Sequence, residues 1–251
     1  MYIVFLTILI IFFLIPAVDA LIDKKKNKDK PKIVTTERMR CKQYLQSAAF
    51  LWGAVVVVLI MCFIAKINLE DLGFRPIRLD TGWVAVVTLV LWGLAVAFFL
   101  YQTILGLVSA KHRAAAEKEF TAAGNEGIDM VIPRTKKEKW LFSFVSLSAG
   151  ICEEILYRGF FVFLLQAIFP GIPLYLVALI PSVIFGVSHF YQGVQGVLKI
   201  GATGAVIMCL FLASGSLIPC IVLHFIMDFS STFLLSEKQE KQEAVQEGQE
   251  S

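Results

Sequence analysis

Residues 82–109 read GWVAVVTLVLWGLAVAFFLYQTILGLVS, a run of 28 residues without a charged side chain. A helix that spans a bilayer needs about 20 mostly apolar residues, because the hydrocarbon offers no water to the backbone N–H and C=O groups. The whole chain agrees: 57% of its 251 residues are hydrophobic, 17% are charged, and the mean hydropathy is +0.74. We therefore predict an all-α, polytopic bundle of transmembrane helices.

Seven stretches have the length and composition of a transmembrane helix. The first could instead be a signal peptide, but no basic residue precedes its apolar core and three lysines follow it, so a retained anchor is preferred. The seven spans are expected near Tyr2–Ile22, Tyr44–Ala65, Gly82–Ser109, Trp140–Gln166, Ile172–Phe190, Val194–Ala213 and Ser216–Leu235.

Lysine and arginine predict the orientation, because cytoplasmic loops accumulate them. Nine lie in 23–42 and seven in 110–139, against three in 66–81. We expect the two rich loops and the acidic C-terminus inside, in the plasma membrane of a bacterium. The formal charge of +3 then reflects topology and indicates no nucleic-acid partner.

Four segments follow from these patterns. Residues 1–43 form an anchor and a basic loop, and 44–139 form two spans and a polar linker. Residues 140–235 form the core that carries embedded charges, and 236–251 form an acidic tail, expected to be disordered because it has few apolar residues.

The five cysteines form no CxxC pair, and four of them lie inside predicted spans. A disulfide framework or a thiolate zinc site is therefore not expected. Cys152 is adjacent to Glu153, but a thiol in apolar surroundings is inert, so a cysteine nucleophile is not expected either.

Ionisable residues are concentrated in the last four predicted spans. An acid or an arginine at the centre of a bilayer costs roughly 2.5–3.5 kcal/mol on insertion scales, so such residues pair, face a cavity or take part in chemistry. Lys199 is expected to extend toward the membrane surface or to line the inner mouth of the site. The embedded residues are Glu153, Glu154, Arg158, His189, Lys199, His224 and Asp228.

Helical spacing predicts which of these residues share a face. Residues four apart are neighbours and adjacent residues diverge by about 100°. Glu154 can therefore pair with Arg158 while Glu153 points elsewhere, and His224 lies beside Asp228.

Phe185 and His189 share a face in the same way, and Gly186 between them permits the close approach of another backbone. His189 falls near the inner edge of its predicted span, whereas Glu153 and His224 lie deeper. Tilt, an inner boundary later than Phe190 or a shorter embedded fourth helix, the predicted span Trp140–Gln166, would bring the three groups to one level.

Glu153, His189, His224 and Asp228 together contain the groups needed to activate water for hydrolysis. Two routes fit these residue types. In one, Glu153 is a desolvated general base. In the other, the histidines and a carboxylate hold Zn²⁺, which acidifies its bound water.

Three motifs occur in order on successive hydrophobic segments. EEILYR (153–158) matches EExxxR, FGVSH (185–189) matches FxxxH, and HFIMD (224–228) matches HxxxN/D. Over about 140–235 the chain resembles the CAAX protease and bacteriocin-processing (CPBP) family of intramembrane endopeptidases, which includes relatives of the type II CAAX prenyl protease. The resemblance implies a hydrolase of either the metalloprotease or the glutamate-dependent type.

The resemblance also implies a role for each matching position. Glu153 would activate the attacking water and His189 would help to hold it. His224 and residue 228 would stabilise the oxyanion or, with His189, bind zinc. An anionic Asp228 donates no hydrogen bond, whereas the prenyl protease branch often has Asn, so metal binding or orientation of His224 are its alternatives. The ion pair of Glu154 and Arg158 would support the site and the packing of its helix.

The resemblance suggests as partners membrane lipids and a peptide or lipidated protein substrate. That substrate could carry a prenylated C-terminal CaaX sequence, or it could be a secreted or immunity peptide. Two other functions remain open: a catalytically silent scaffold or bacteriocin-immunity factor of the same fold, and a proton-coupled transporter, since embedded Glu, His and Asp also form relays. The sequence does not determine the oligomeric state.

Overall fold

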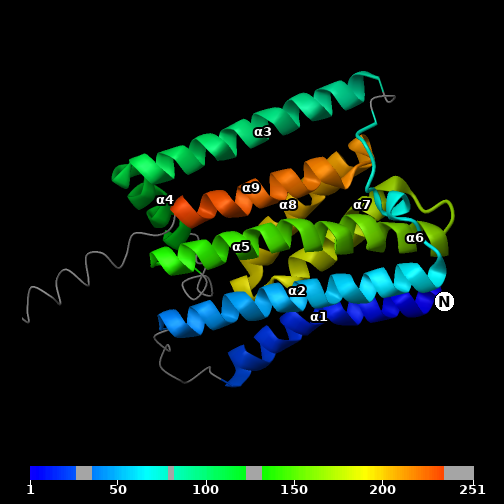
Figure 1. The fold of residues 1–251 in the computed structure, drawn as a ribbon, viewed down its shortest axis with the longest axis horizontal. Helices are drawn as coiled ribbons and strands as arrows, with labels where there is room; N and C mark the ends of the chain where they lie inside the picture. Colours follow the sequence, from blue (N-terminus) through cyan, green and yellow to red (C-terminus); the bar gives the residue numbers. More distant parts are fainter. Residues whose placement is uncertain (27–35, 79–81, 123–131, 235–251) are drawn as a thin grey trace, which may run out of the picture.

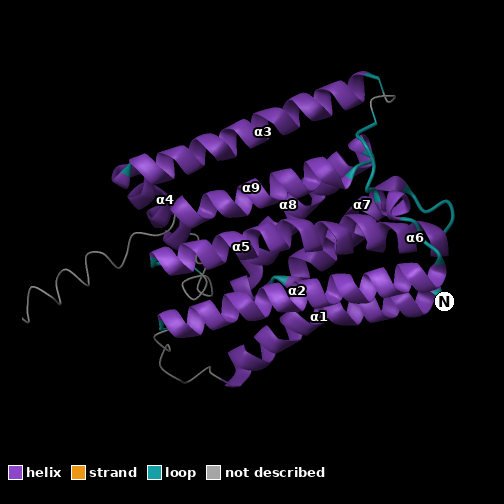
Figure 2. Cartoon of the chain, in the orientation of Figure 1, coloured by secondary structure: helices purple, strands orange, loops and turns teal. Residues whose placement is uncertain are grey.

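The computed structural model describes residues 1–26, 36–78, 82–122 and 132–234. Within these ranges the chain is helical and contains no strand, which confirms the predicted all-α bundle (Figure 1, Figure 2). The predicted acidic tail lies outside the described residues. The elements are α1 (Tyr2–Lys26), α2 (Glu37–Ala65), η1 (Leu69–Leu72), α3 (Trp83–Val108), α4 (Ala110–Ala122), α5 (Lys136–Glu153), η3 (Glu154–Phe161), α6 (Val162–Ile168), α7 (Leu174–Ser188), η4 (Phe190–Gln192), α8 (Gly193–Ser214) and α9 (Leu217–Leu234).

Each of the seven predicted spans falls on a helix, but not all are of spanning length and apolarity. In the described part of the chain, five segments meet that standard: α1, α2, α3, η4 with α8, and α9. The predicted span Trp140–Gln166 lies on the continuous helical stretch α5–η3–α6, whose first turns are polar. The predicted span Ile172–Phe190 is shortened to α7, which has 15 residues.

The helices lie roughly side by side as one bundle (Figure 1). The C-terminal end of α1 and the first residues of α2 lie at the same end of the bundle as α4, the start of α5 and the end of α9. This is the arrangement that the lysine and arginine counts predict. The stretch α5–η3–α6 runs through the middle, with α2 and α9 against α5, while α3 lies on the outside against α9.

Two threonines begin the helices that meet at the polar end of the bundle. Thr36 caps α2, and its side chain accepts a hydrogen bond from the backbone N–H of Met39. Thr135 and Glu138 form a capping box at the start of α5. Glu138 also accepts a bond of 2.8 Å from Arg40 Nε, and both side chains are buried. This pair ties the start of α5 to α2.

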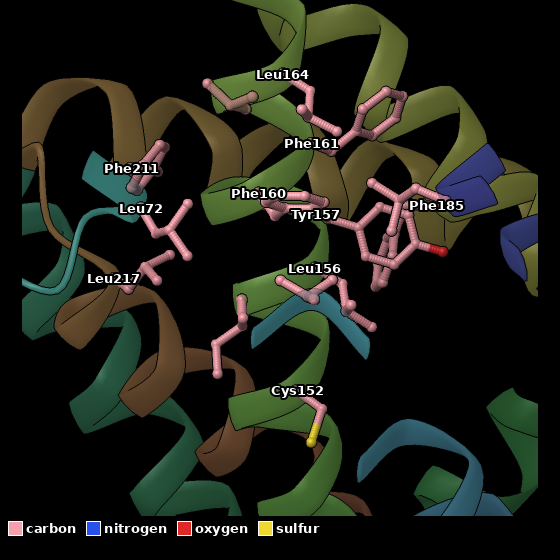
Figure 3. Close-up of a cluster of buried hydrophobic side chains, with 14 of the residues drawn as sticks. Leu72, Cys152, Leu156, Tyr157, Phe160, Phe161, Leu164, Phe185, Phe211 and Leu217 are labelled. Carbon is pink, nitrogen blue, oxygen red and sulfur yellow. The ribbon is translucent and has the colours of Figure 1, made fainter. Parts of the chain in front are cut away.

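The apolar core surrounds η3 and α6. Figure 3 shows Leu156, Phe160, Phe161 and Leu164 projecting from this stretch among side chains of other elements. Helix α1 joins the same core, because Phe13 stacks on Tyr157 with ring centroids 3.9 Å apart. Retention of the first segment as an anchor stays a prediction.

Candidate active site

The first motif lies where the central helix changes its hydrogen-bonding pattern. Helix α5 ends at Glu153, and the next eight residues, Glu154–Phe161, form a π-helix. Turns of this kind are rare and occur often at functional sites, because the i→i+5 pattern redirects side chains relative to an α-helix. The spacing of four residues used to predict neighbours describes an α-helix only, so the sequence pattern does not predict this change.

Glu154 is the centre of a buried polar cluster. Its Oε1 atom accepts a hydrogen bond from Arg158 Nη1 at 2.9 Å, so the expected ion pair is present. The same oxygen lies 2.7 Å from Nδ1 of His224 on α9. Since a carboxylate paired with a guanidinium is an acceptor, the His224 Nδ1 atom carries a proton and donates it.

Arg158 extends this cluster to two further helices. Its Nη2 atom donates to the backbone carbonyl of Gly204 on α8 at 3.0 Å. Its guanidinium carbon also lies 4.8 Å from the ring centroid of Phe185 on α7, within the range of a cation–π contact. The residue thereby connects the π-helix to both neighbouring helices.

The other ring nitrogen of His224 faces two more carboxylates. Its Nε2 atom lies 3.7 Å from Glu153 Oε2 and 3.7 Å from Asp228 Oδ2. Both distances exceed a hydrogen bond, so this nitrogen is near both acids without being bonded to either. Glu153 and Glu154 point in different directions, as the spacing predicts, and they reach opposite nitrogens of one imidazole.

His189 is held in a similar way from the end of α7. Its Nδ1 atom lies 2.8 Å from the carbonyl oxygen of Phe185 and 3.2 Å from the hydroxyl of Ser188. That hydroxyl donates to the same carbonyl at 2.8 Å and accepts a bond of 3.0 Å from Tyr157. A carbonyl only accepts, so Nδ1 of His189 is protonated and the Nε2 atom of the neutral ring is an acceptor.

The length of α7 explains how His189 reaches the depth of the other groups. Fifteen residues at 1.5 Å each extend about 22 Å, less than the roughly 30 Å of a hydrocarbon core. The helix ends at Ser188, so His189 stays inside the bundle. The shorter helix expected from the sequence was the fourth span, whereas the structure shortens the fifth, and α7 ends before Phe190 rather than after it.

Phe185 packs among the side chains of the site. Its ring contacts those of His189 and His224, with centroids 4.8 and 6.1 Å away, and meets Tyr157 edge-on at 4.9 Å. Figure 3 shows Phe185 and Tyr157 side by side. The phenylalanine of FxxxH therefore fixes the separation of the two histidines by packing.

Gly186, the next residue, allows the close approach that the sequence predicts. A Cβ atom at Gly186 would lie 2.6 Å from the carbonyl oxygen of Val197 and 3.1 Å from Cα of Gly201, both on α8. Only a residue without a side chain permits this contact. It holds the end of α7, and with it His189, against α8.

Glu153, His189, His224 and Asp228 all line one cavity of about 790 Å³. Glu154 and Arg158 are buried beside it and do not line it. The geometry thus separates four residues that can meet a substrate from two that hold them. Cys152 and Lys199 lie away from this space: Cys152 is fully buried, and Lys199 is exposed on α8.

The cavity continues away from the acids between α1 and α2. Its wall there contains Phe12 and Phe50, whose rings stack at 4.2 Å. Polar side chains from both helices also line this part, namely Asp19, Gln43, Gln46 and Ser47. The aromatic rings of this branch can contact an apolar chain, and its polar side chains can form hydrogen bonds with a peptide backbone.

A zinc site needs at least three protein ligands that converge on one point. Among the residues that the structure describes, no three His, Cys, Asp or Glu side chains form a group that could hold a metal. Nδ1 of each histidine already has a partner, which leaves only the two Nε2 atoms. His189, His224 and Asp228 do not converge into such a group in this structure, and zinc binding by these residues stays a prediction.

Three residues of the site were not identified from the sequence. Tyr157 and Ser188 form the hydrogen-bonded support of His189. Tyr191 follows His189 by two positions and lines the cavity. Tyr157 lies inside the first motif and Ser188 inside the second. Closeness to the motifs was therefore the signal in the sequence that could have identified these residues and Tyr191.

Residues 135–230 match the model of one protein family, described as type II CAAX prenyl endopeptidase Rce1-like. The matched segment runs from the cap of α5 to α9 and contains all three motifs. This match confirms the resemblance that the motifs indicate, and it points to a peptidase in a membrane. No curated protein and no solved structure matches the chain.

Proposed function

We propose that the protein is an intramembrane endopeptidase that hydrolyses peptide bonds of membrane-associated substrates with water activated by Glu153. One observation carries the proposal. Glu153, His189 and His224 come from three separate motifs and line a single cavity, and each histidine is held through Nδ1 so that Nε2 is free. A packing role alone would not require two imidazoles oriented in this way.

In the proposed reaction the attacking water lies between the Glu153 carboxylate and Nε2 of His189. Glu153 takes a proton from the water as its oxygen attacks the carbonyl carbon of the scissile bond. When the tetrahedral intermediate collapses, Glu153 gives that proton to the leaving amine. General acid–base catalysis of this kind contributes about 10²–10⁴-fold to a rate, and no covalent intermediate is needed.

His224 is the proposed contact to the carbonyl oxygen of the substrate, and Asp228, 3.7 Å from its Nε2, is proposed to orient that ring. When Nε2 of His224 carries a proton, its N–H can donate to the developing oxyanion. Nδ1 of the same ring donates to Glu154, whose carboxylate balances the positive charge of the imidazolium. Glu154 and Arg158 therefore act as positioning residues.

The shape of the cavity supports a substrate with an apolar portion. The branch between α1 and α2 is walled by aromatic rings and stays continuous with the Glu153 site. We propose that a membrane-associated peptide, or a lipidated one, places its apolar part there. By the distribution of lysine and arginine, we place the entrance of the cavity on the cytoplasmic side.

Mass-spectrometric mapping of cleavage tests this function. Purified protein in lipid discs is incubated with a peptide library in prenylated and unprenylated forms, with Glu153→Gln as the control. Cleavage by the wild type alone supports the proposal. Faster cleavage of the prenylated or of the unprenylated peptides shows whether the protein recognises a prenyl group. Loss of cleavage with a zinc chelator, and its return with added zinc, would support the predicted metal. Equal products from both proteins, or none from either, would contradict the proposal and favour a scaffold.

A further inference from the structure

The proposed reaction, on which this inference rests, leaves one hydrogen-bond donor unassigned. Stabilising an oxyanion generally takes more than one donor. Asp228 lines the cavity and is 41% exposed, but an ionised carboxylate only accepts hydrogen bonds. His224 alone is then left to donate, and a second donor must come from elsewhere in the cavity wall.

Most hydroxyl groups beside the motif residues already donate to the protein. Tyr157 donates to Ser188 at 3.0 Å, and Ser188 donates to the carbonyl of Phe185 at 2.8 Å. Ser231 donates to the carbonyl of Asp228 at 2.6 Å. Each of these protons is committed to the fold, so none is free for a substrate oxygen.

Tyr191 differs from these three residues. Its hydroxyl oxygen accepts a hydrogen bond of 3.0 Å from the side-chain amide of Gln192. Among the described residues no acceptor takes its own proton. The amide fixes the oxygen while the O–H remains free to donate, which is the arrangement that an oxyanion donor needs.

The position of Tyr191 also fits this role. It lines the cavity and is 42% exposed. Its ring lies 5.7 Å from that of His189, centroid to centroid, so the phenol is close to the imidazole that is proposed to hold the water. Glu153 and Asp228 line the same cavity as this phenol. Thr203 lines the cavity too, but has no such ring contact.

We infer that Tyr191 is a further catalytic residue, whose O–H donates a hydrogen bond to the carbonyl oxygen of the scissile peptide as that oxygen becomes negative. The C–O bond to water forms while the carbonyl π pair moves onto this oxygen, and the proton of the water goes to Glu153. The Tyr191 proton stays on the phenol throughout. On collapse, the C–N bond breaks and Glu153 protonates the amine.

Steady-state cleavage of the best peptide by Tyr191→Phe in lipid discs tests the inference. Removal of a single oxyanion donor lowers kcat by about 10²–10³-fold, and we expect KM to change less than about twofold, because the bond is made in the transition state. Tyr175→Phe removes a phenol on the exposed side of α7, outside the lining of the cavity, and should keep the wild-type kcat.

A rescue experiment separates donation from packing. Asp228→Asn places an amide N–H near the same oxygen, so adding it to Tyr191→Phe should recover part of kcat, whereas a loss caused by misplaced packing would not recover. Thermal unfolding of each variant shows whether it is folded, and kcat is expressed per folded molecule if Tyr191→Phe is partly unfolded. Wild-type kcat in Tyr191→Phe, or a change in KM alone, would overturn the inference and leave the proposed function standing. No Glu153-dependent cleavage by the wild type would overturn both.

Discussion

Glu154 Oε1 lies 2.7 Å from His224 Nδ1, although 70 positions separate the two residues in the chain. This contact joins the π-helix to α9 and orients the imidazole, so that Nε2 faces Glu153 and Asp228. The same oxygen accepts the bond from Arg158. A pair that the sequence predicts as structural support therefore also sets the direction of a histidine in the candidate site.

Breaking the pair of Glu154 and Arg158 should destabilise the fold. Both side chains are at most 1% exposed, and removal of one partner of a buried ion pair costs about 3–5 kcal/mol, since the other charge stays buried. Glu154→Gln and Arg158→Ala should each lower the folded yield and the thermal unfolding midpoint of protein in detergent.

The pair of Glu37 and Lys137 offers the matched control for this measurement. These charges lie 3.9 Å apart and are 42% and 69% exposed, and exposed pairs contribute only about 0–1 kcal/mol. Glu37→Gln should leave the unfolding midpoint nearly unchanged. Full yield without activity in Glu154→Gln would assign the pair to the reaction rather than to the fold.

His189→Ala should abolish peptide cleavage while leaving membrane insertion and expression near the wild-type level. The imidazole is proposed to hold the attacking water through Nε2, and its removal leaves the supporting Tyr157 and Ser188 in place. His112→Ala is the matched control, because His112 bonds to Gln102 away from the cavity. Comparable rates in wild type and His189→Ala would remove His189 from the site.

Gly186→Ala should lower the free energy of unfolding by about 1–3 kcal/mol, the usual cost of overpacking. The added methyl group would lie 2.6 Å from the Val197 carbonyl oxygen, so α7 and α8 must separate. Chemical denaturation in detergent measures the change. Gly53→Ala, where no atom lies within 4 Å, should stabilise α2 slightly. An unchanged midpoint in Gly186→Ala would show that the two helices separate without cost.

Long apolar runs and helical spacing predicted much of this architecture. Each expected span falls on helical structure, because a membrane-embedded backbone has few alternatives to it, although only five segments of the described chain are long and apolar enough to span a bilayer. The pairing of Glu154 with Arg158 and the close approach at Gly186 followed from residues four apart and from the absence of a side chain. These relationships are local, so the sequence carries them directly.

The remainder depends on contacts between distant segments. The π-helix after Glu153 changes the direction of side chains in a way that an α-helical spacing does not describe. The bond from His224 to Glu154 joins α9 to η3, and the hydroxyl of Ser188 meets Tyr157 from another helix. The depth of His189 required the true end of α7, which hydrophobicity alone places two residues too late.

The central claim, that Glu153 activates water in this cavity, is tested most directly by the single-turnover cleavage rate of wild type and Glu153→Gln on one peptide in lipid discs. Glu70→Gln is the matched control, because it removes an exposed carboxylate that does not line the cavity. We predict a loss of at least about 10²-fold in Glu153→Gln, with Glu70→Gln close to wild type and all three proteins equally folded. Equal rates in wild type and Glu153→Gln would contradict the claim.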